Sequence, residues 1–75
     1  MPESENNQKM ADAVRKIAEL AKSEFLKTVC RDALAAGTDY ALKEALVVAR
    51  NTHGEDVHVM ITAHYALGGH GSWST

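Results

Sequence analysis

Several residue types are scarce in this 75-residue sequence, and each scarcity excludes a class of protein. The single cysteine, Cys30, cannot form an internal disulfide, which is typical of a reducing compartment, so we expect a cytoplasmic protein. The longest apolar run covers residues 45–49 and is too short to cross a membrane. The first ten residues also lack the basic start and apolar core of a signal peptide.

Aromatic residues make up only 5% of the chain, which predicts a thin core to which a partner surface could add. The formal net charge of -2 argues against nucleic acid as a partner, because binding phosphates needs a concentrated basic surface. Acidic and basic residues balance over residues 1–54, and Glu55 and Asp56 are the last charged residues of the chain. We therefore divide it into a helical recognition region, residues 1–54, and an uncharged C-terminal tail, residues 55–75.

The recognition region has the apolar spacing of helices. One apolar stripe recurs every three or four residues from Met10 to Ala21, and a second stripe, shifted in phase, runs from Leu26 to Leu34. Either the stripe winds around one long helix, or the helix breaks near Ser23. Gly37 should end this part, and Thr38 should cap a further helix that stops at Gly54. The predicted fold class is all-α, a small bundle of two to three helices with an extended or disordered C-terminal tail.

Residues 57–65 alternate between two sets of side chains and contain several β-branched residues, which favours an extended strand. A helix over residues 57–67 is the competing interpretation. The following residues, 68–75, are rich in glycine, and we expect them to be disordered.

No group of residues predicts a catalytic, cofactor or metal site. Four histidines lie between residues 53 and 70, but His58 and His64 would be about 20 Å apart in a strand and would point apart in a helix. Cys30 lies in an apolar stripe, where a thiol is inert, and the adjacent Glu55 and Asp56 most simply mark a turn. We therefore expect neither an enzyme nor a metal protein, and no cofactor.

Four stretches resemble parts of the precursors of ribosomally synthesised, post-translationally modified peptides. Residues 66–69, ALGG, look like the double-glycine end of many leaders, so Gly68 and Gly69 are the candidate leader end. The stretches EFLKTVCRDALAA and ALKEA are similar to helical leaders related to nitrile hydratase, and VHVMITAHYA resembles the core of a split borosin precursor.

That resemblance implies a function in which the helices bind a maturation enzyme and present the tail for modification of its backbone or side chains. The alternative is a small helical protein-binding module or regulator whose tail docks on a partner. The candidate modified segment comprises Val57, His58, Val59, Met60, Ile61, Thr62, Ala63, His64 and Tyr65. The candidate partner-binding residues are large apolar side chains: Ile17, Leu20, Phe25, Leu42, Leu46 and Trp73.

Overall fold

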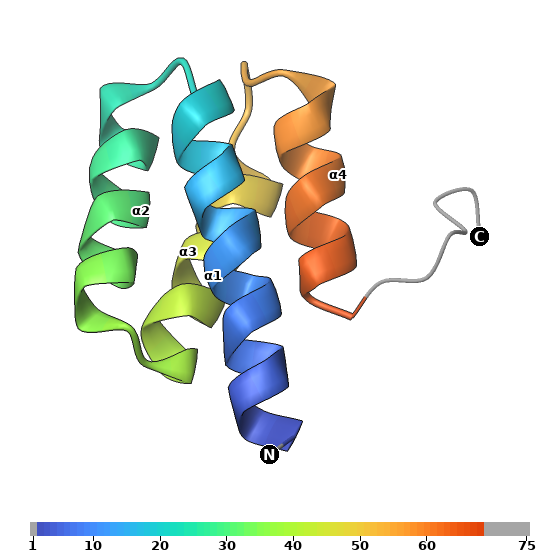
Figure 1. Ribbon diagram of the computed structural model, residues 1–75. Helices are drawn as coiled ribbons and strands as arrows, with labels where there is room; N and C mark the ends of the chain where they lie inside the picture. Colours follow the sequence, from blue (N-terminus) through green and yellow to red (C-terminus); the bar gives the residue numbers. More distant parts are fainter. Residues whose placement is uncertain (1, 69–75) are drawn as a thin grey trace.

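The computed structural model describes the backbone of residues 2–68 and the side chains of residues 7–68, and this part of the chain forms four helices. They are α1 (Pro2–Leu20), α2 (Glu24–Ala36), α3 (Asp39–Asn51) and α4 (Val57–Ala66). Consecutive helices run in opposite directions, with α3 behind α1 and with α2 and α4 on the two sides (Figure 1). Helices α1 and α3 contact each other and both flanking helices, so they form the centre of the bundle.

The helix boundaries follow local capping chemistry and confirm three sequence predictions. The Ser23 hydroxyl accepts a hydrogen bond from the backbone N–H of Leu26 at 3.3 Å, so a new helix starts there. Gly37 ends α2 in a left-handed conformation with φ of 70°. Thr38 then caps α3 by accepting from the N–H of Ala41 at 3.1 Å.

The end of α3 differs from the prediction of Gly54. The helix ends at Asn51, with Thr52 as its C-cap. The Thr52 hydroxyl donates to the backbone oxygen of Val48 at 2.6 Å and so satisfies a carbonyl in the last turn. The connection to α4 is therefore longer than the sequence suggested.

The prediction of an extended segment at residues 57–65 is wrong, because these residues form α4, and the described chain has four helices rather than two to three. Asp56 caps the helix, and Val59 and Ala63, four residues apart, are completely buried. Packing against α1 and α3 thus outweighs the strand preference of the β-branched residues. The tail therefore forms a helix of the bundle with its first ten uncharged residues and contributes Val59 and Ala63 to the core.

The core is built from small and medium side chains. Alanine supplies five of its thirteen buried residues, so the helices can approach one another closely. Among the described residues no polar or charged side chain is buried. The buried set comprises Met10, Val14, Ile17, Ala21, Leu26, Cys30, Ala33, Leu42, Ala45, Leu46, Ala49, Val59 and Ala63.

Asn7 fixes the end of the bundle where α2 turns into α3. Its side-chain amide donates to the backbone oxygen of Gly37 at 3.0 Å and to the Asp39 carboxylate at 2.6 Å. One residue of α1 thereby holds both the last residues of α2 and the first residue of α3, thirty or more positions away in the sequence.

Candidate functional site

Helix α4 differs from the other helices because its ten residues include no Lys, Arg, Asp or Glu. Its inner side buries Val59 and Ala63, whereas its outer side carries Val57, Ile61 and Tyr65 at intervals of four residues. Val57 is 58% exposed and Tyr65 47% exposed. An apolar side of a helix is usually covered by a neighbour, and α4 contacts only α1 and α3 within the described chain.

Asp56 starts α4 through two contacts with one residue. Its carboxylate accepts from the backbone N–H of His58 at 2.8 Å and lies 2.8 Å from Nδ1 of the same histidine. The backbone hydrogen bond, followed by the side-chain contact, lowers the pKa of the Asp56 carboxyl below its ordinary value. The negative charge at this position also complements the positive end of the helix dipole.

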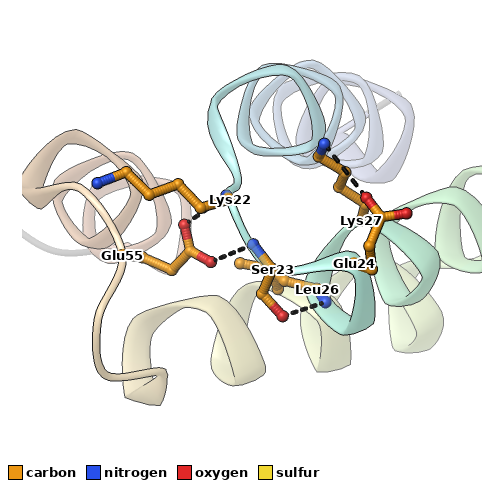
Figure 2. A network of polar contacts seen from close by, with 6 residues as sticks. All are labelled: Lys22, Ser23, Glu24, Leu26, Lys27 and Glu55. Atoms are coloured by element: carbon orange, nitrogen blue, oxygen red, sulfur yellow. Dashed lines mark hydrogen bonds and ion pairs between the residues drawn. The ribbon is translucent and has the colours of Figure 1, made fainter.

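Glu55 fixes the start of α4 relative to the connection between α1 and α2. Its two carboxylate oxygens accept from the backbone N–H groups of Lys22 and Ser23, each at 2.8 Å. Figure 2 shows the carboxylate reaching across from the α3–α4 connection to these amides. The residue predicted to mark a turn therefore joins two loops of the bundle.

A groove of about 520 Å³ opens where α1, the start of α3 and the end of α4 meet. We call it the basic groove because Lys9 and Lys43 line it and form no ion pair within the described residues, whereas the carboxylate of Asp39 is held by Asn7. Met10 lies almost fully buried at its base. The groove is lined by Lys9, Met10, Asp39, Tyr40, Lys43, Tyr65, Ala66, Leu67 and Gly68.

A second depression of about 360 Å³ lies between α2 and α3. We call it the acidic hollow because its two charged residues are Asp32 and Glu44. Its remaining lining is apolar apart from Tyr40, which also borders the basic groove and is 75% exposed. The full set is Val29, Asp32, Ala33, Tyr40, Ala41, Glu44, Ala45 and Val48.

The structure separates the residues predicted to bind a partner into two groups. Ile17, Leu42 and Leu46 have no exposed surface and belong to the core, so they offer nothing to a partner of the folded protein. Leu20 is 37% exposed and Phe25 68% exposed, and both lie near the connection between α1 and α2. Their role in binding stays a prediction, and Trp73 lies outside the described residues.

The candidate modified segment, residues 57–65, lies entirely within α4 and is therefore hydrogen-bonded as a helix. Of the candidate leader end, Gly68 directly follows the last turn of α4 with φ of 93°, and Gly69 lies outside the described residues. Modification of the backbone in this segment would require α4 to unwind.

Cys30 is completely buried, and this burial raises the pKa of its thiol to about 11. The thiol is therefore protonated near neutral pH and out of reach of a substrate. In the part of the chain that the structure describes, no three His, Cys, Asp or Glu side chains converge as a metal site would require. None of the helices over residues 2–68 combines the length and apolar character needed to span a membrane.

Sequence reasoning missed the basic groove and the acidic hollow. Tyr40 lies between the two depressions and lines both. Lys9 and Lys43 come from different helices, and no local pattern in the sequence brings them together. Only the position of Asp56, directly before an apolar run, carried a recognisable signal, that of a helix N-cap.

No family model matches this chain, and neither a curated protein nor a solved structure has significant similarity to it.

Proposed function

We propose that this protein is a helical protein-binding module that presents the outer side of α4 to a partner. The observation that carries this proposal is a helix without charged residues whose outer side exposes Val57 and Tyr65. Apolar side chains at intervals of four residues are the usual anchors when a helix docks into the groove of another protein. Each such side chain stabilises a complex by about 1.5–3 kcal/mol when it becomes fully buried.

A photo-crosslinking experiment in the native cell tests this proposal. A photoreactive amino acid replaces Val57 in one variant and the exposed Arg31 of α2 in a control variant. A protein crosslinked from position 57, and not from position 31, should be identified and its affinity measured. The Val57→Asp variant, which places a charge on the same side of α4 and outside both depressions, should weaken that affinity at least tenfold. Equal crosslinking from both positions would contradict the proposal.

The second candidate function is the precursor peptide, and the composition of α4 supports it. Four of its ten residues are β-branched, which lowers helix propensity, and only Val59 and Ala63 are fully buried. The segment can therefore leave the bundle at modest cost and lie extended, without charge, in the active site of a maturation enzyme. In this proposal α1, α2 and α3 hold the enzyme while residues 57–65 are modified.

Co-expression with maturation enzymes encoded beside this gene, followed by intact mass measurement, distinguishes the two functions. The precursor hypothesis predicts a mass increase that fragmentation places within residues 57–65. A partner that binds through α4 and leaves the mass unchanged supports the binding module and contradicts the precursor hypothesis.

A further inference from the structure

The surface around Tyr40 carries opposite charges on its two sides. On one side lies the basic groove with Lys9 and Lys43, and on the other lies the acidic hollow with Asp32 and Glu44. Tyr40 borders both and is 75% exposed. Large aromatic side chains that stand this free of their own protein are typical of interface centres.

The geometry of α3 explains this division. Lys43 and Glu44 follow Tyr40 by three and four residues, so both lie near it on the helix surface. Because successive residues of a helix are about 100° apart, Lys43 and Glu44 point to opposite sides of a line drawn along the helix axis through Tyr40. One turn of α3 therefore presents a base, an aromatic ring and an acid side by side.

We infer that this surface, around Tyr40, binds a second copy of the same chain. A two-fold axis parallel to α3 and passing by Tyr40 places the basic groove of one copy over the acidic hollow of the other, and the reverse. Such an interface is isologous, since the whole surface, basic groove and acidic hollow together, is complementary to itself. The two Tyr40 rings then meet at the axis, and each copy sets its two lysines against two carboxylates.

Charge complementarity favours a second copy over an unrelated partner. A purely basic or purely acidic partner would be attracted at one side of Tyr40 and repelled at the other. A copy rotated by 180° has charges opposite to those on both sides. Asp39 also lines the basic groove and keeps its charge, because Asn7 donates to it from a neutral amide, but two lysines against one carboxylate leave that groove with a net positive charge. Tyr65 belongs both to the basic groove and to the outer side of α4, whereas Val57 lines neither depression, so the inference does not depend on the proposed function.

Sedimentation equilibrium of the full chain, from micromolar to millimolar concentration, tests the inference. We expect a monomer–dimer equilibrium that weakens as salt is added, because exposed ion pairs are screened. Lys43→Glu and Glu44→Lys should each raise the dissociation constant about tenfold or more, since each reverses two contacts in the symmetric dimer. The double variant, in which the two charges are exchanged, should return towards the affinity of the wild type.

Matched controls separate this effect from general changes in charge or stability. Lys16→Glu and Glu19→Lys make the same charge changes at exposed positions of α1 outside both depressions, and they should leave the dimer unchanged. Tyr40→Ser keeps the charges and should weaken the dimer, and far-UV circular dichroism should show that every variant is folded.

Three results would overturn the inference. The first is a monomer at every concentration, and the second is a double charge exchange as weak as either single reversal. The third is protection of the Tyr40 ring that does not change with concentration, which would show that a segment of the same chain covers it. Binding through α4 is measured at Val57, which lines neither depression, so the proposed function would stand or fall separately.

Discussion

Replacing Glu55 by alanine should destabilise the fold by about 2 kcal/mol, because two backbone N–H groups lose their acceptor. Both hydrogen bonds, to Lys22 and Ser23, measure 2.8 Å and involve a charged carboxylate. A buried bond of this kind contributes about 1.5–3 kcal/mol. Since Glu55 is only partly buried and Lys22 is exposed, we assign about 1 kcal/mol to each bond.

Urea denaturation followed by far-UV circular dichroism measures the loss. A domain of this size has a urea dependence near 1 kcal/mol per molar, so a loss of about 2 kcal/mol should lower the midpoint by about 2 M. The melting temperature should fall by about 8–16 °C. In NMR spectra the amide signals of Lys22 and Ser23 should shift more than those of any other loop residue.

Glu19→Ala serves as the matched control, because Glu19 is exposed and its carboxylate makes no hydrogen bond within the described chain. It should change stability by less than about 0.5 kcal/mol. The stability of Glu55→Gln should lie between those of Glu55→Ala and the control, since the glutamine side chain keeps one acceptor oxygen and turns an NH₂ donor towards the other backbone N–H. If Glu55→Ala is as stable as the control, the carboxylate does not hold the two loops together.

Three further predictions concern single residues. Gly37→Ala should cost about 1 kcal/mol in urea denaturation, because its φ of 70° is unfavourable for any residue with a Cβ atom. Cys30 should react with a disulfide reagent far more slowly in the native protein than in urea, since burial raises the pKa of its thiol to about 11; equal rates would contradict the burial. Asp56→Ala should be less stable than the wild type at neutral pH. That difference should vanish in acid, because the pKa of Asp56 is lowered from 3.8, chiefly by the backbone N–H of His58, and the carboxylate stabilises the fold only while it is ionised.

The first three helices could be predicted from the sequence because their apolar residues recur every three or four positions and their caps are local. Ser23, Gly37 and Thr38 each act on residues within four positions, so the signal lies in a short window. Helix α4 could not be predicted in the same way, because apolar residues occur on all its sides and leave no helical period. What makes it a helix is the burial of Val59 and Ala63 against distant helices.

The depressions around Tyr40 were beyond sequence reasoning for a similar reason. The basic groove combines side chains from three helices, and the acidic hollow combines two. A sequence shows which residues share one face of a helix, but it does not show which faces of different helices become neighbours. The hydrogen bonds of Glu55 span more than thirty positions and were hidden in the same way.

Asn7 and Glu55 also determine where this chain could accept an inserted segment. Loops are normally the places where a tag or a reporter is tolerated, since they run over the surface and pack little. Here extra residues between Gly37 and Asp39 would pull one of Asn7's two acceptors away from the other. Extra residues between Lys22 and Ser23 would separate the two N–H groups that donate to Glu55. The peptide bond between His53 and Gly54 is therefore the internal site to choose for an engineered insertion, because both residues are exposed and both precede Glu55.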